Sequence, residues 1–148
     1  VKVISFGLMS EMFSILKPID KVSIASVYKI EPDEMEMYLP ILANYRNLCA
    51  HEDIVFNHFT QRVIPDTKYH SILQIEKSNN EYVYGKNDIF ALIIILKRLL
   101  TKDDFKMMMN EINYEFDRLC GKLSVIKIAD VINAMGFPQN YKDIMYIE

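Results

Sequence analysis

Glycine and proline are scarce in this sequence of 148 residues, which contains only 4 Gly and 5 Pro. Hydrophobic residues make up 51% of the chain and charged residues 25%. A chain with few helix-breaking residues and this much apolar material folds rather than remaining disordered, and helix is its favoured element. The length suits one compact domain with a single core. We therefore predict one all-α domain over residues 1–148.

Cysteine is also rare, and its spacing gives no metal or disulfide signal. Cys49 and Cys120 form no CxxC pair, so neither a zinc site nor a disulfide framework is predicted, and a reducing cytoplasm fits the chain. Cys49 lies between Leu48 and Ala50 in a helix-like stretch. We expect it to be an inert core residue rather than a nucleophile.

Long apolar runs and a leader segment are missing as well. The longest run, Ile89 to Leu96, ends at Lys97 and Arg98 and is shorter than the roughly 18 to 20 residues that cross a bilayer. We predict a buried helix there and no membrane partner. The chain begins at Val1 without Met, a basic segment or a cleavage site, so we expect no signal peptide and a fragment of a longer protein.

Positive charge is in deficit, because 17 Lys and Arg stand against 20 Asp and Glu and give a net charge of -3. Such a chain has no global attraction for polyanions. Any nucleic-acid site must therefore be a local patch.

Apolar periodicity and breaker residues predict a series of helices. Asp20 is expected to cap the second helix and Asp103 or Asp104 a later one, while Pro40 should kink or restart the third. Gly121 and Gly136 are expected at helix ends. The expected helices cover residues 7–17, 22–30, 32–51, 88–100, 105–119 and 126–135, with a final turn or helix at 141–146.

A long irregular connection is expected after the third helix, over residues 58–87. Its only regular signal is a weak alternation over residues 69–75, which predicts a short strand or turn. His58 and His70 are interpreted as ordinary loop histidines. Lys97 and Arg98, after the connection, are interpreted as a solvated helix end rather than a phosphate clamp.

A cluster of polar residues interrupts the apolar pattern at the end of the third helix. Arg46, Asn47 and His51 must either face solvent or build a site, because burying them without partners is costly. Asn47 and His51 are four apart and share a helix face, whereas Arg46 lies about 140° around from His51. A frayed last turn, or a second copy of the helix across a dimer axis, would bring all three together, and the spacing favours the dimer.

The residue types in this cluster suit RNA cleavage through the 2′-hydroxyl. The imidazole of His51 can move protons near neutral pH, and the guanidinium of Arg46 can stabilise a charged phosphorane. Asn47 is expected to orient these groups. The chemistry requires no metal or cofactor, and His51-Glu52 with His58 lacks the spacing of a helical zinc motif.

The string RNLCAH at residues 46–51 resembles the R-x4-H signature of HEPN ribonucleases and the RN-x-CAH core of Abi-like abortive-infection proteins. Ser5-Phe6-Gly7 resembles the start of that family's domain, Asn57 its asparagine after the motif, and residues 135–141, MGFPQNY, its closing segment. The resemblance implies a HEPN-like helical bundle, a homodimer, RNA as substrate, and Arg46, His51 and Asn47 as site residues in a phage-defence or toxin-antitoxin system. An antitoxin or a regulatory RNA is implied as a further partner.

Two features depart from the family pattern. The family often has a basic residue three positions after the histidine, where this chain has Ile54, and Glu52 and Asp53 add negative charge nearby. Two other interpretations therefore remain. Arg46 pairs with Glu52 or Asp53 while His51 caps the helix, or the chain is a catalytically inactive HEPN module that binds RNA or a protein partner.

Overall fold

The computed structural model describes residues 5–148, which are mostly helical and carry one small hairpin. This confirms the all-α prediction. The elements are α1 (Phe6–Ile15), α2 (Pro18–Val27), α3 (Pro32–Ala50), α4 (Lys68–Ile72), β1 (Lys77–Ser78), β2 (Glu81–Tyr82), α5 (Ile89–Leu99), α6 (Lys102–Cys120), α7 (Ile128–Ala134) and the 3₁₀ helix η1 (Tyr141–Met145).

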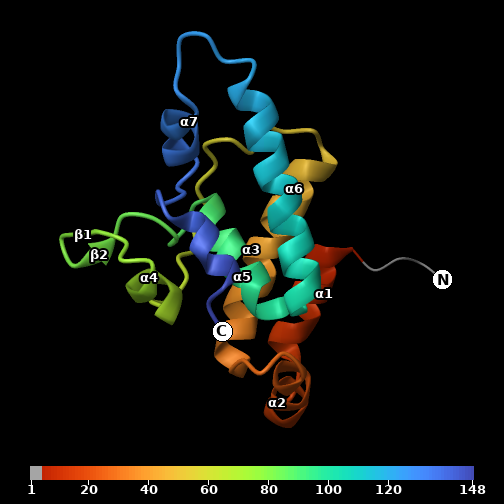
Figure 1. Ribbon diagram of the computed structural model, residues 1–148. Coiled ribbons are helices and arrows are strands. Elements are labelled where there is room, and N and C mark those ends of the chain that lie inside the picture. The colour runs from red at the N-terminus through yellow and green to blue at the C-terminus, as the bar shows by residue number, and fades with distance from the viewer. Residues whose placement is uncertain (1–4) are drawn as a thin grey trace.

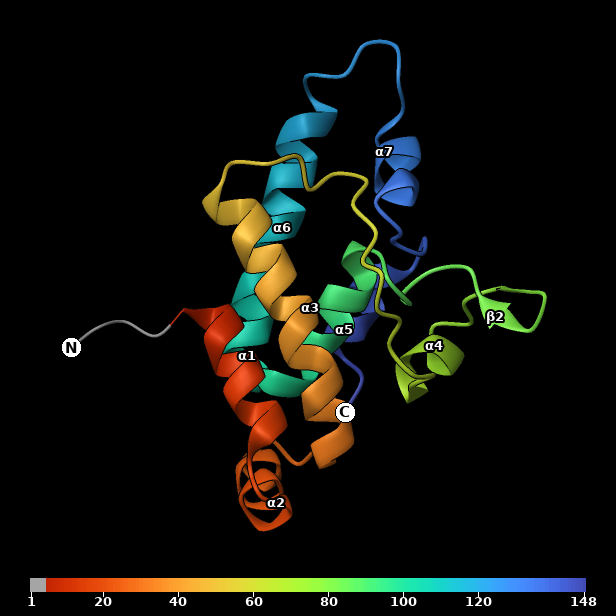
Figure 2. The ribbon, with the colours of Figure 1, turned by 180° about the vertical axis from the view of Figure 1, so that it is seen from behind.

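The helices form a bundle in which α3 and α5 occupy the centre (Figures 1 and 2). Helix α3 packs against α1, α2 and α5, and α6 packs against α5, α7 and η1. The antiparallel hairpin pairs Lys77 with Tyr82 and Ser78 with Glu81, and it projects from the side of the bundle (Figure 1). Within residues 5–148, no helix combines the length and the apolar character that crossing a bilayer requires.

Helix α5 supplies much of the core, as its apolar composition predicts. Six of its residues are buried: Ile89, Phe90, Ala91, Ile93, Ile94 and Ile95. The helix begins at Asp88, whose carboxylate accepts a hydrogen bond from the backbone N–H of Ala91 at 2.9 Å. A side-chain acceptor at this position satisfies an N–H that has no partner inside the helix.

Helix α3 begins where its sequence predicts and ends at Ala50, one residue before the expected end. Pro32 is in its first turn, and Glu31 and Glu34 form a capping box. The helix runs unbroken through Pro40, so the predicted restart does not occur. Tyr38 and Ile41 on either side of Pro40 are almost fully buried, and this packing outweighs the lost backbone hydrogen bond.

Two predicted caps are wrong by a few residues. Helix α2 begins at Pro18, so Asp20 lies in its first turn, because proline is already fixed in a helical φ at such a position. Helix α6 is capped by Thr101, whose hydroxyl accepts from the backbone N–H of Asp104 at 3.2 Å. Asp103 and Asp104 lie in the first turn of α6, where their negative charge interacts favourably with the positive end of the helix dipole.

The connection after α3 differs from its prediction around His70. Residues 68–72 form α4 rather than a strand, and His70 is fully buried rather than a loop histidine. Its Nδ1 accepts from the backbone N–H of Thr67 at 3.0 Å, so its Nε2 carries the proton that is donated to the carbonyl of Gly85 at 2.8 Å. The ring also stacks on Tyr82 with centroids 4.7 Å apart, and burial lowers the pKa of His70.

Arg98 is another residue whose predicted environment is wrong. Its guanidinium binds both carboxylate oxygens of Glu34, at 2.5 and 2.9 Å, and it also approaches the hydroxyl of Tyr38 at 3.4 Å. This paired contact joins the start of α3 to the end of α5. Burial raises the pKa of Tyr38 to about 12. Arg98 therefore has a structural partner and is not a free cation at a helix end.

Asp88 is expected to make stability depend on pH. Burial raises the pKa of Asp88 from 3.8 to about 6. Between these two values the folded chain keeps a proton that the unfolded chain has released, and this difference stabilises the fold. The stabilisation is complete below pH 3.8 and is lost as the pH rises through 6. The shift corresponds to about 3 kcal/mol.

Urea unfolding of the wild type and of Asp88→Asn across this range measures the effect. The free energy of unfolding of the wild type, relative to that of the variant, is expected to fall with rising pH, because the amide does not titrate. A constant difference between the two chains would contradict the prediction.

Candidate functional site

The three predicted catalytic residues lie together at the C-terminal end of α3. Arg46 and Asn47 belong to its last turns, and His51 is the C-cap residue, whose backbone N–H donates to the carbonyl of Asn47 at 3.0 Å. Glu52 follows with φ 55°, and the N–H of Asp53 donates to the carbonyl of Leu48 at 3.0 Å, which closes the helix. All three predicted side chains are exposed to solvent.

The contacts of Arg46 test the interpretation in which it pairs with Glu52 or Asp53. Its guanidinium donates to Oδ1 of Asn47 at 3.2 Å. Within residues 5–148 it forms no ion pair with Glu52 or Asp53 and no hydrogen bond with His51. The salt-bridge interpretation is therefore wrong. The structure brings Arg46 to Asn47 but does not join it to His51 within one chain.

The segment that follows the motif folds back along α3 and fixes His58. The Nε2 atom of His58 lies 2.7 Å from Oδ1 of Asn44, and the backbone carbonyl of His58 accepts from the hydroxyl of Tyr45 at 3.3 Å. The rings of His58 and Tyr45 meet edge to face, with centroids 5.4 Å apart. Burial raises the pKa of the Tyr45 phenol. His58 thus lies in the connection, as expected, and hydrogen bonds hold it beside the motif helix.

A polar hollow of about 410 Å³ lies beside the motif, between α1 and α3. In Figure 2, α1 flanks one side of α3 and the chain that follows α3 flanks the other. Asn47 connects the hollow to the motif, because its side chain lines the hollow and accepts from Arg46. The lining residues are Gly7, Ser10, Glu11, Ser14, Glu36, Pro40, Ala43, Asn44, Asn47 and Arg62.

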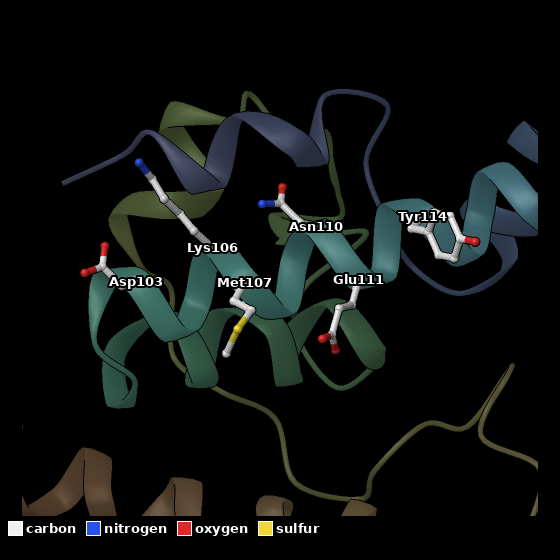
Figure 3. A pocket seen from close by; sticks show the side chains of 6 residues that line it. All are labelled: Asp103, Lys106, Met107, Asn110, Glu111 and Tyr114. Carbon is white, nitrogen blue, oxygen red and sulfur yellow. The ribbon is translucent and has the colours of Figure 1, made fainter.

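Another hollow runs along α6 and has a different character. Its volume is about 490 Å³, and Figure 3 shows its six lining side chains on one helix. Lys106 and Asn110 extend to one side of the helix, whereas Met107 and Glu111 extend to the other. The groups do not converge on one point, as the polar groups of a binding site do.

Cys49 and the side chains of types that can bind a metal ion remain to be placed. Cys49 is exposed rather than part of the core, and it lies one turn beyond the buried Tyr45, next to the end of α3 at Ala50. Across residues 5–148, no group of three or more His, Cys, Asp or Glu side chains is arranged to hold a metal ion.

Sequence reasoning missed Asn44 and Arg62. Asn44 lies three residues before Asn47, so helical spacing places both on one side of α3, and this signal was available. Arg62 gives no such signal, because its position depends on how the irregular connection folds back across α3.

The fold and site together define a class, that of helical proteins with an exposed Arg-Asn-x-x-x-His segment at the end of a long helix. Over its first part the chain is similar to the Abi-like family, because the family model described as Abi-like protein matches residues 1–57. The match covers α1, α2, α3 and the whole motif, and it supports the Abi-like resemblance predicted from the sequence. Residues 58–148 lie outside it. No curated protein and no solved structure matches the chain.

Proposed function

We propose that this chain is a metal-independent endoribonuclease of a phage-defence or toxin-antitoxin system, with RNA as its substrate. The observation that supports this most directly is the environment of Arg46, Asn47 and His51. All three are exposed at one helix end, and among the described residues the guanidinium of Arg46 is bound only by Asn47. These side chains are therefore free to contact a ligand.

The proposed chemistry is transesterification at an RNA phosphate. A general base removes the proton of the 2′-hydroxyl, the 2′-oxygen attacks phosphorus, and the bond from phosphorus to the 5′-oxygen breaks. A general acid returns a proton to that leaving oxygen, so the products are a 2′,3′-cyclic phosphate and a 5′-hydroxyl. His51 supplies proton transfer, and Arg46 stabilises the phosphorane charge. Asn47 positions Arg46 through its observed hydrogen bond.

A homodimer is part of the proposal because one chain does not join Arg46 to His51. The two residues are five positions apart and lie on different sides of the helix end. A second α3 end, packed against the first, would place His51 of one copy near Arg46 of the other, as a two-fold axis allows. The exposed C-terminal end of α3 leaves room for this arrangement.

Product analysis in the presence and absence of EDTA tests the proposal. We expect the purified chain to cleave single-stranded RNA at similar rates in both conditions, because no proposed step uses a metal ion. The products should carry 2′,3′-cyclic phosphate ends, which acid treatment opens. Cleavage that stops in EDTA, or that leaves 3′-hydroxyl ends, would contradict the proposed chemistry.

A catalytically inactive HEPN module is the second candidate function. The exposed carboxylates of Glu52 and Asp53 beside the motif, together with the net charge of -3, weaken the attraction for RNA and favour this alternative. In this case the same surface would hold an RNA or a protein such as an antitoxin without cleaving it. RNA that copurifies intact with the wild-type chain would support it.

A further inference from the structure

Arg62 is held in a fixed position beside the motif helix by the backbone around it. The N–H of Thr60 donates to the carbonyl of Asn87 at 2.7 Å, and the N–H of Ile64 donates to the carbonyl of Lys86 at 2.8 Å. The hydroxyl of Thr60 donates to the carbonyl of Arg62 itself at 2.6 Å. Ile64 is only 1% exposed and anchors the segment in the core. The backbone of Arg62 is therefore fixed beside the polar hollow, which the residue lines.

The charges around the hollow leave Arg62 without a partner. Glu36 lines the hollow but is paired with Lys21 at 2.6 Å. Glu11 also lines it, from α1. Within residues 5–148 the guanidinium of Arg62 makes no ion pair. By contrast, Arg98 and Arg118 each bind a glutamate.

The two asparagines of the hollow are arranged as hydrogen-bond donors. Oδ1 of Asn44 accepts from Nε2 of His58 at 2.7 Å, and Oδ1 of Asn47 accepts from Arg46 at 3.2 Å. Both carbonyl oxygens are therefore engaged, and each side chain still has an NH₂ group to donate. With the five N–H groups of Arg62, the hollow offers many donors beside the motif, which suits the acceptor oxygens of a phosphate.

We propose that this hollow is a subsite for an RNA phosphate adjacent to the scissile one, with Arg62 as its anchor and Asn44 and Asn47 as further donors. The inference rests on RNA being the ligand, as in the proposed function. Glu11, which lines the hollow from α1, disfavours a second phosphate and can accept from a ribose hydroxyl, so the hollow suits one nucleotide of a chain. Arg62 lies beyond the residues 1–57 matched by the Abi-like model.

Binding of a fluorescently labelled single-stranded RNA to the full chain tests the subsite. The His51→Ala background prevents cleavage during the titration. Adding Arg62→Ala should weaken binding roughly 10-fold and reduce the slope of log affinity against log salt by about 1, as the loss of one phosphate contact does. The matched control is Arg118→Ala, which removes the same charge from an exposed arginine on α6 that is paired with Glu115 at 2.8 Å. The control should leave both quantities unchanged.

The outcomes separate the subsite from the proposed ribonuclease activity. Equal RNA affinity of the Arg62→Ala and Arg118→Ala chains would overturn the subsite, and cleavage lost in Arg46→Ala would still support the ribonuclease. Weaker binding by Arg62→Ala alone, with a wild-type chain that never cleaves RNA, would support the subsite and overturn the ribonuclease. No binding of RNA by the His51→Ala chain would overturn the subsite. Unchanged thermal midpoints confirm that each variant is folded.

Discussion

Replacing His51 by alanine is expected to slow RNA cleavage by roughly 10²- to 10⁴-fold, the usual contribution of a positioned general acid or base. Arg46→Ala should slow it by roughly 10²- to 10³-fold, because the phosphorane loses a charged donor. Both side chains are exposed at the end of α3, so the free energy of unfolding should change little. Initial rates with end-labelled RNA, together with thermal midpoints, measure the two effects.

The control for this pair is again Arg118→Ala, which lies on α6 and should cleave at the wild-type rate. Wild-type rates in both Arg46→Ala and His51→Ala chains would remove these residues from catalysis. Slow cleavage accompanied by a large fall in thermal midpoint would assign them to folding instead, contrary to their exposure.

Mixing the two inactive variants tests whether the site is shared between subunits. In a mixed dimer, the chain with Arg46→Ala still has His51 and the chain with His51→Ala still has Arg46. One of the two shared sites is then complete, so free exchange of subunits should restore about a quarter of the wild-type activity. A site formed within one chain has no complete copy in any such dimer. Failure to restore activity after confirmed exchange would therefore contradict the shared site.

Helix positions were predictable from this sequence where local chemistry determines them. Pro32 with the acidic residues after it marks the start of α3, and the apolar run after Asp88 marks α5, because caps and continuous apolar residues act through near neighbours. The exact caps of α2 and α6 were misplaced. Pro18 begins α2 as its first residue, and Thr101 rather than an aspartate caps α6; the sequence alone does not rank these signals against a nearby aspartate.

The environments of individual polar residues were less predictable, because distant partners determine them. His70 is hydrogen-bonded to the carbonyl of Gly85, fifteen residues away, and Arg98 is bound by Glu34, 64 residues away. Neither partner can be inferred from neighbouring residues. The short α4 was mistaken for a strand or turn because so few residues do not display a helical period.

The candidate site likewise combines features set by neighbouring residues with features set by distant ones. The motif was found from residue types and spacing, and its place at a helix end was correct. Asn44 lies beside the motif through helical spacing, whereas His58 and Arg62 join it only through the return of the connection along α3, which is a tertiary event. The absent hydrogen bond between Arg46 and His51 agrees with the 140° separation expected on an ideal helix.

Gly136 shows how the C-terminal segment is locked onto the start of α5. Its φ is 85°, a left-handed conformation, and a Cβ atom built there would lie 2.4 Å from the carboxylate of Asp88. That carboxylate already accepts the backbone N–H groups of Gly85 and Ala91, so it has little freedom to move. The absence of a side chain at residue 136 is therefore a requirement of the packing beside α5.

Gly136→Ala is accordingly expected to lower the free energy of unfolding by roughly 2 to 5 kcal/mol, because about 1–2 kcal/mol comes from the left-handed backbone and about 1–3 kcal/mol from overpacking. Gly121→Ala is the matched control, since its φ is -67° and its nearest neighbour atom would be 3.7 Å away. It should be neutral or stabilising by up to about 1 kcal/mol. Urea unfolding followed by circular dichroism measures both. The cost of Gly136→Ala should shrink in an Asp88→Ala background, because the clashing carboxylate is gone, and an unchanged cost there would show that backbone strain alone is responsible.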